Sequence, residues 1–260
     1  YIMSDSMFGA VKLYELMMQE KEKFDLNIVV IPDISRSKEH MIEKYNTAKQ
    51  FVLQKYGTEM LLDGYDEKND KFIDHSDKFD VVYCANPYDG VVNEMHTMRY
   101  LSTKNLLPFY LQYGFSHFRY GDKHITTQFG VNLCWKVFLN NKFEFDGFKK
   151  FAPFSGKNAM ITGYAKMDNF QIKQKDGKSQ KTILIASHRS TDGNVIRISN
   201  FLYYYDFILT LPKIFPNVRF IFRPHPVLFE DLIQSKTWSK EQANEYLEKI
   251  KSIMEFSSGG

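Results

Sequence analysis

The chain contains little cysteine and lacks the common nucleotide-loop motifs, and these absences argue against several classes of protein. Cys84 and Cys134 are the only cysteines in 260 residues, and they lie far apart without metal-ligand spacing. A disulfide-stabilised secreted scaffold is therefore not expected, and we interpret both as reduced core thiols of a cytoplasmic protein. No Gly-x-Gly-x-x-Gly or Gly-x4-Gly-Lys-Ser/Thr motif occurs, which argues against dinucleotide-binding and P-loop proteins.

Long apolar runs and a large net charge are also missing. No stretch reaches the roughly 18–20 uninterrupted apolar residues of a membrane span, and no secretory signal is recognisable. Any membrane association is therefore expected to be peripheral, at the inner face of the cell membrane. The formal net charge of +3 is too small to predict a nucleic-acid partner.

The acidic and histidine residues do not form metal-binding patterns. No Asp-x-Asp pair is present, and His75, His96, His117 and His124 lack partners at metal-ligand spacing. We therefore predict a protein that needs no metal or other cofactor.

What the sequence does contain is an alternation of strands and helices. This pattern is typical of an α/β fold with a parallel sheet flanked by helices. In the first part of the chain we expect strands at Asn27–Pro32, Glu59–Leu62, Phe79–Cys84, Leu107–Leu111 and Ala159–Gly163, and helices at Gly9–Lys21, Lys38–Tyr56 and Val91–Leu101. Between residues 115 and 154, only Thr126–Phe129 and Val131–Leu139 are candidates for regular structure, and each fits either strand or helix.

A polar stretch, Lys173–Lys181, predicts a linker to a second unit. We expect domains at 1–168 and 169–260. The second unit offers two good strands, fewer than a stable parallel sheet normally has, so we interpret it as incomplete and the chain as a segment of a larger protein. Its expected elements are strands Thr182–Ala186 and Val218–Phe222, and helices Ser199–Leu211, Leu228–Ser235 and Lys240–Met254.

The strand Val218–Phe222 ends abruptly in Arg223-Pro224-His225-Pro226. In open α/β sheets, ligands bind outside the carboxyl ends of the strands. A cation and a titratable imidazole at that point suit a phosphorylated ligand. The alternative is a proline-rich turn whose histidine only packs or meets solvent.

The strand Thr182–Ala186 ends in a similar way, with His188, Arg189 and Ser190 just beyond it. Charged donors form hydrogen bonds of roughly 1.5–3 kcal/mol, against about 1 kcal/mol for neutral ones. If both strands belong to one parallel sheet, His188 and His225 should lie within roughly 15 Å of each other. The alternative is a solvated loop.

Two further segments are candidates for the other side of the site. Gly163–Asp168 follows a strand at the junction of the two units, and its Lys166 is placed to reach an anion in a cleft between them. An ordinary turn with a surface lysine is the alternative. Tyr113 and Gly114 end the strand Leu107–Leu111 and are candidates for the acceptor side.

Several short boxes together resemble the CDP-glycerol glycerophosphotransferase family of teichoic acid and capsule synthesis. Gly163–Asp168 looks like that family's Gly-Tyr-Pro-Lys-x-Asp box, with Ala165 in place of proline. The other boxes that carry the resemblance are Ile183–Ser190, Ser199–Phe207, Phe220–Pro226, Trp238 and the opening Asp5–Pro32. Two features depart from the family. Tyr113-Gly114 stands where some members carry a His-Gly box with a candidate base, and the later Asp-x-Ser-Ser donor box is absent.

The resemblance implies a GT-B arrangement, with two Rossmann-like halves and the active site between them. It implies a cell-envelope transferase that moves a glycerophosphate-type group from a CDP-linked donor to a polysaccharide or lipid-linked acceptor. His225 and His188 would be catalytic, and Arg223, Arg189, Ser190 and Lys166 would bind the donor phosphates. Because the donor box is missing, we expect this chain alone to be a poor catalyst.

Two other readings remain open from the sequence. One is a GT-B glycosyltransferase that uses a nucleotide sugar in capsule or lipopolysaccharide synthesis. The other is a non-catalytic scaffold of a capsule assembly complex, which Tyr113 favours because it stands where a base is expected.

Overall fold

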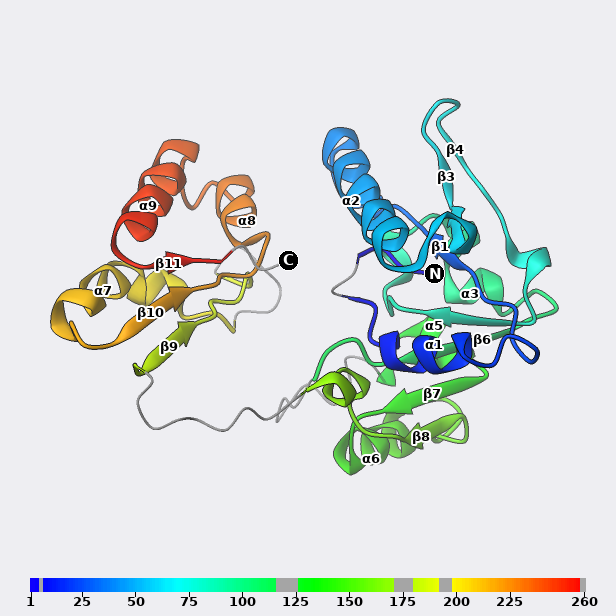
Figure 1. Cartoon of the computed structure of the whole chain (residues 1–260). Helices are drawn as coiled ribbons and strands as arrows, with labels where there is room; N and C mark the ends of the chain where they lie inside the picture. The colour runs from blue at the N-terminus through cyan, green and yellow to red at the C-terminus, as the bar shows by residue number, and fades with distance from the viewer. Residues whose placement is uncertain (5–6, 116–125, 171–179, 192–197, 258–260) are drawn as a thin grey trace. The chain divides into compact units, whose positions relative to one another are not determined.

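The structure is a computed structural model that describes residues 1–4, 7–115, 126–170, 180–191 and 198–257. The chain divides into two compact units, Tyr1–Gln171 and Ile172–Gly260, and each is an α/β assembly built on parallel strands (Figure 1). Each unit is described by itself below.

The first unit contains a parallel sheet of four strands in the order β5 (Val81–Cys84), β6 (Leu107–Leu111), β7 (Lys136–Leu139) and β8 (Ala159–Ile161). A second parallel pair is formed by β1 (Ile28–Val30) and β2 (Leu61–Asp63). A short antiparallel hairpin of β3 (Tyr65–Asp66) and β4 (Lys71–Phe72) extends beside it (Figure 1).

The first two residues join the two parallel sheets of this unit. Ile2 forms a parallel bridge with Val30, with its N–H donating to the Val29 carbonyl at 3.0 Å. On the other side, the Tyr1 N–H donates to the Tyr83 carbonyl at 2.8 Å. The resulting order, β2-β1-(Tyr1–Ile2)-β5-β6-β7-β8, becomes 3-2-1-4-5-6-7 when strands are counted along the chain. This is the strand order of a Rossmann-type sheet.

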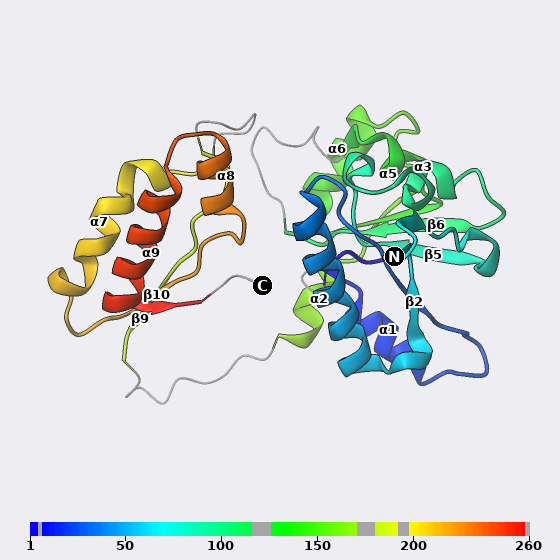
Figure 2. The same cartoon turned by 90° about the horizontal axis from the view of Figure 1, so that it is seen from above.

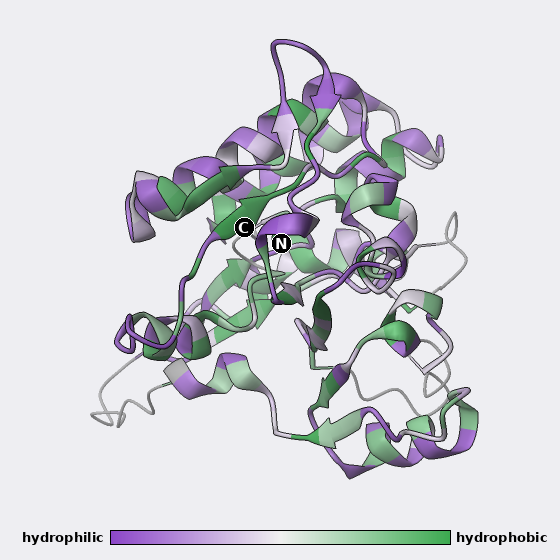
Figure 3. Ribbon diagram, turned by 90° about the vertical axis from the view of Figure 1, so that its right-hand side faces the viewer, coloured by the Kyte–Doolittle hydropathy of each residue, from purple (hydrophilic) through white to green (hydrophobic). Residues whose placement is uncertain are grey.

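Helices cover this sheet on both faces, because successive strand residues point to opposite sides. Val29 belongs to the core shared with α3 (Met98–Leu101), α5 (Phe129–Leu133) and α6 (Lys142–Phe151), whereas Ile28 and Val30 belong to the core shared with α1 (Val11–Met18) and α2 (Lys38–Tyr56). Seen from above, these groups of helices lie on opposite sides of the strands (Figure 2). The strands are mostly apolar, whereas the helices carry both polar and apolar residues (Figure 3).

The helix boundaries follow from capping residues. The hydroxyl of Ser37 accepts a hydrogen bond from the His40 N–H and begins α2, and Gly57, at φ +92°, ends it. Along α2 the buried residues recur at helical spacing: Met41, Tyr45, Ala48, Val52 and Tyr56. In the second unit, α9 (Lys240–Ile253) begins with the capping box that Ser239 and Gln242 predict.

The second unit is a parallel sheet of three strands in the order β11 (Glu255–Phe256), β10 (Arg219–Phe222) and β9 (Thr182–Ile185). The helices α7 (Phe201–Ile214), α8 (Leu228–Gln234) and α9 share one core with it, in which Phe220 and Phe222 of β10 are buried. Counted along the chain, the order is 3-2-1, the same as the first three strands of the other unit.

Most of the expected elements are present, with three corrections. The expected helix Val91–Leu101 consists of two 3₁₀ turns (Asp89–Val91 and Glu94–His96) followed by α3, because Asn93 and Thr97 each cap a new turn. The expected strand Glu59–Leu62 begins as the 3₁₀ turn Thr58–Met60. The second unit has a third strand, β11, whose two residues are too few for an apolar run. The expected linker Lys173–Lys181 falls mostly outside the described residues.

Candidate functional site

The two histidine-containing segments lie side by side at the carboxyl ends of β9 and β10. Backbone pairing continues past the strands, because the Arg223 N–H donates to the Ile185 carbonyl at 2.9 Å and the His225 N–H to the Ser187 carbonyl at 2.8 Å. The imidazole rings of His188 and His225 lie 5.5 Å apart between centroids, at an interplanar angle of 62°. The predicted proximity of these two histidines is therefore confirmed.

His188 is held by its neighbour Ser190. Its Nδ1 accepts a hydrogen bond from the Ser190 N–H at 3.1 Å and lies 2.8 Å from the Ser190 Oγ. Partial burial lowers the pKa of His188 below its ordinary value, and the positive charge of Arg189 lowers this pKa further. The imidazole is therefore neutral at pH 7.

His225 has a related arrangement, since its Nδ1 accepts from the Val227 N–H at 3.4 Å. Arg223 lies two residues earlier, just beyond the end of β10. Its guanidinium is exposed and forms no ion pair with any residue that the structure describes. A cation in this position is available to an anionic ligand.

Arg189, the other predicted phosphate ligand, is engaged within the protein. Its Nε donates to the Asp231 Oδ2 at 2.6 Å, and the Asp231 side chain is only 9% exposed. This ion pair connects the segment after β9 to the first turn of α8. No signal in the sequence indicated Asp231, because the two residues are 42 positions apart.

Ser190 is likewise buried and contacts His188, and the next residue, Thr191, is also buried. Thr191 is 2% exposed. Its Oγ1 forms no hydrogen bond with any described part of the chain. A buried polar group without a partner is uncommon in native proteins.

The candidate residues of the first unit also converge. The Tyr164 hydroxyl donates to the Tyr113 carbonyl at 3.1 Å, which brings the Gly163–Asp168 box against the segment after β6. The Asn140 side chain donates to the Gly114 carbonyl at 3.1 Å. Gly163 has φ +87°, a conformation that favours glycine. Lys166 lies in the 3₁₀ turn Ala165–Asn169.

Tyr113 is a poor replacement for a histidine base. Burial raises the pKa of its phenol well above the ordinary value, and the nearby Tyr88 raises it further. The hydroxyl therefore stays protonated at neutral pH and has no tendency to accept a proton.

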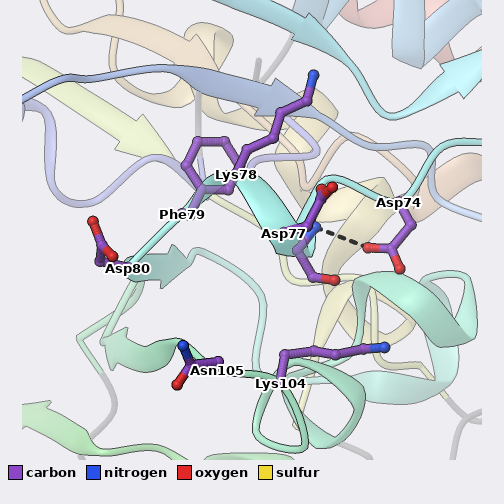
Figure 4. A pocket seen from close by; sticks show the side chains of 8 residues that line it. Asp74, Asp77, Lys78, Phe79, Asp80, Lys104 and Asn105 are labelled. Carbon is purple, nitrogen blue, oxygen red and sulfur yellow. Dashed lines mark hydrogen bonds between the residues drawn. The ribbon is translucent and has the colours of Figure 1, made fainter.

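The first unit also has a hollow on its surface, and none of the predicted site residues of this unit lines it. Its volume is about 680 Å³, and its lining carries charges of both signs: Asp74, Asp77, Lys78, Asp80 and Lys104 (Figure 4). The Asp74 carboxylate accepts from the Ser76 N–H at 2.9 Å. These residues precede β5 and β6, so the hollow is at the amino ends of the strands, whereas ligands of open α/β sheets bind at the carboxyl ends.

Comparisons with protein-family models, curated proteins and solved structures found no match for this chain. Within the described ranges, no group of three or more His, Cys, Asp or Glu residues is arranged to hold a metal ion. None of the helices in these ranges has the length and apolar composition needed to cross a membrane.

Proposed function

We propose that this protein is a transferase of the CDP-glycerol glycerophosphotransferase type, with a GT-B fold. It would move a glycerophosphate-type group from a CDP-linked donor to a teichoic-acid-like or polysaccharide acceptor in cell-envelope synthesis. The observation that carries the proposal is the proximity of the His188 and His225 rings, 5.5 Å apart, together with the exposed Arg223 in the same segment as His225.

The arrangement suits a diphosphate because catalysis of phosphoryl transfer depends mainly on positioning and on fixed groups that stabilise charge. In this proposal the Arg223 guanidinium offers a planar set of donors to the phosphoryl oxygens. Each imidazole offers one N–H donor. The acceptor hydroxyl attacks the phosphorus distal to cytidine and loses its proton to water, and the bond from that phosphorus to the CMP oxygen breaks.

The roles of the other residues follow from their contacts. Arg189 and Ser190 hold the loop that carries His188. Lys166 remains a ligand of the donor phosphates, and Tyr113 and Gly114 belong to the acceptor side. His225 donates to the leaving group as CMP departs. The unsuitability of Tyr113 as a base specifically favours one other candidate function, a non-catalytic scaffold that binds the donor without turning it over.

The experiment is calorimetric titration of the protein with CDP-glycerol, CMP and UDP-sugars, followed by analysis of products with a polymer acceptor. The proposal expects binding of CDP-glycerol, release of CMP and formation of a phosphodiester. Binding without CMP release would support the scaffold, and transfer of a sugar from a UDP-sugar would support a glycosyltransferase. Absence of binding to all cytidine ligands would refute the proposal.

A further inference from the structure

The hydroxyl of Ser190 lies between a backbone amide and an imidazole. Ser190 is 5% exposed, so its Oγ is largely hidden from solvent. The Oγ accepts from the Ile198 N–H at 3.3 Å and lies 2.8 Å from the His188 Nδ1. The same loop is fixed by its backbone, since the Ser199 N–H donates to the Ser190 carbonyl at 3.0 Å.

These contacts determine the direction of the hydrogen bond between Ser190 and His188. The Ser190 N–H points to Nδ1 at 3.1 Å, so Nδ1 must present its lone pair, because an N–H there would oppose another N–H. The Ser190 Oγ already accepts from Ile198, and its own hydrogen is available to donate to Nδ1. In a neutral imidazole with Nδ1 as acceptor, the proton is on Nε2.

We propose that Ser190 is a positioning residue that holds His188 as the neutral tautomer with its proton on Nε2. His188 then acts as a hydrogen-bond donor through Nε2 and does not act there as a general base. This inference rests on the proposed function in one respect only, namely that the Nε2–H donates to a phosphate of the ligand. Ser190 itself does not need to touch the ligand.

The neighbouring histidine supports this assignment. His225 also directs Nδ1 at the N–H of the residue two positions later, Val227, at 3.4 Å. Both imidazoles, in the segments that follow two adjacent strands, thus accept a backbone N–H at Nδ1. Among the residues that the structure describes, the charged groups in the two segments after β9 and β10 are Arg189, with its partner Asp231, and Arg223. Substitution of Ser190 leaves all of these unchanged.

The test is nitrogen NMR of the histidine side chains in the whole chain, with the His188 signals assigned from a His188→Gln variant. We expect wild-type His188 to carry its proton on Nε2 at pH 7.5. Ser190→Ala removes a hydrogen bond that stabilises the neutral form of His188. The titration midpoint of His188 should therefore rise by about 0.5–1 pH unit, which corresponds to the free energy of one hydrogen bond. Ser190→Thr should restore the wild-type midpoint.

The matched control is Thr191→Val, which removes the adjacent buried hydroxyl and should leave the His188 midpoint in place. A wild-type proton on Nδ1, or an unchanged midpoint in Ser190→Ala, would overturn the positioning role. If Ser190→Ala fails to fold, the tautomer of His188 in the wild type is the test: a proton on Nε2 supports the proposal, and a proton on Nδ1 refutes it.

A binding measurement separates this inference from the proposed function. The apparent Kd for inorganic pyrophosphate should increase in Ser190→Ala by no more than about twofold, because the backbone N–H of residue 190 still favours the competent tautomer. If pyrophosphate does not bind the wild type while the NMR result stands, the proposed function fails and the positioning role of Ser190 survives.

Discussion

The ion pair between Arg189 and Asp231 makes a quantitative prediction about the stability of the second unit. The perturbation is Asp231→Asn, which keeps the size of the side chain and one acceptor oxygen but removes the charge. The pair joins two segments that are otherwise distant in sequence, the loop after β9 and the first turn of α8. Loss of the charge therefore loosens the loop that carries His188.

The magnitude follows from the exposure of the two side chains. Asp231 is 9% exposed, but Arg189 is 38% exposed and regains water when its partner is lost. The cost should therefore lie between the roughly 0.2–1 kcal/mol of an exposed pair and the roughly 3–5 kcal/mol of a buried pair that loses one partner. Asp231 contributes a charge-assisted hydrogen bond and a negative charge in the first turn of a helix. Loss of both should reduce the free energy of unfolding by about 2 kcal/mol.

The assay is urea unfolding followed by the fluorescence of Trp238. The chain has two tryptophans, and Trp135 in the first unit is replaced by phenylalanine in all variants. Trp238 packs against Phe201 and Tyr205 in the core of the second unit, with ring centroids 5.6 and 5.1 Å away, so its signal reports that unit. A loss of about 2 kcal/mol lowers the urea midpoint by about 0.7–2 M at an unchanged slope.

The control is the ion pair between Arg219 and Glu255 in the same unit. Both side chains are about half exposed, at 51% and 47%. Glu255→Gln should therefore cost less than about 1 kcal/mol. If Asp231→Asn and Glu255→Gln lower the midpoint equally, burial of Asp231 does not determine the strength of its pair, and the reasoning is wrong.

Three further predictions concern catalysis and pH. Arg223→Ala and His225→Ala should each reduce transfer by about 100-fold or more while changing the free energy of unfolding by less than about 1 kcal/mol; an unfolded or aggregated variant would show that the segment serves packing instead. Transfer should survive EDTA, and complete loss restored by magnesium or manganese would contradict a site based on arginine and histidine. Burial lowers the pKa of His96 in the folded state. The unfolded chain therefore binds a proton first as pH falls below about 6.5, and the first unit loses stability. Urea unfolding at pH 7.5 and 5.5 should show this loss, and His96→Gln should reduce it.

The sequence predicted the strands that are both apolar and long enough to be distinguished. Leu107–Leu111 was expected with its observed bounds, and so was the helix Lys38–Tyr56, whose buried residues recur at helical spacing. Elements of two residues, such as Glu255–Phe256, give no periodicity to detect. The helix Lys142–Phe151 was missed, although Asn141, whose side chain accepts from the Glu144 N–H, was a usable capping signal.

The candidate site was predicted in its parts but not in its division of roles. Parallel pairing of Thr182–Ile185 with Arg219–Phe222 was expected, and it brings the histidines together. The residue types alone could not separate Arg223, which is exposed, from Arg189, which is paired with Asp231. That difference depends on Asp231, which lies in a helix 42 positions beyond Arg189. A contact at this separation cannot be inferred from the sequence pattern.

The place of Tyr1 and Ile2 in the first sheet has a consequence for how that unit folds. Among the described residues, these two provide the only strand pairing between the β1–β2 pair and the β5–β8 sheet. Tyr1 pairs with Tyr83, 82 positions away, so a long loop must close before the two parts meet, and contacts of this kind slow folding. We therefore expect the two parts of the sheet to form separately and to merge in a late step that requires docking of the first strand.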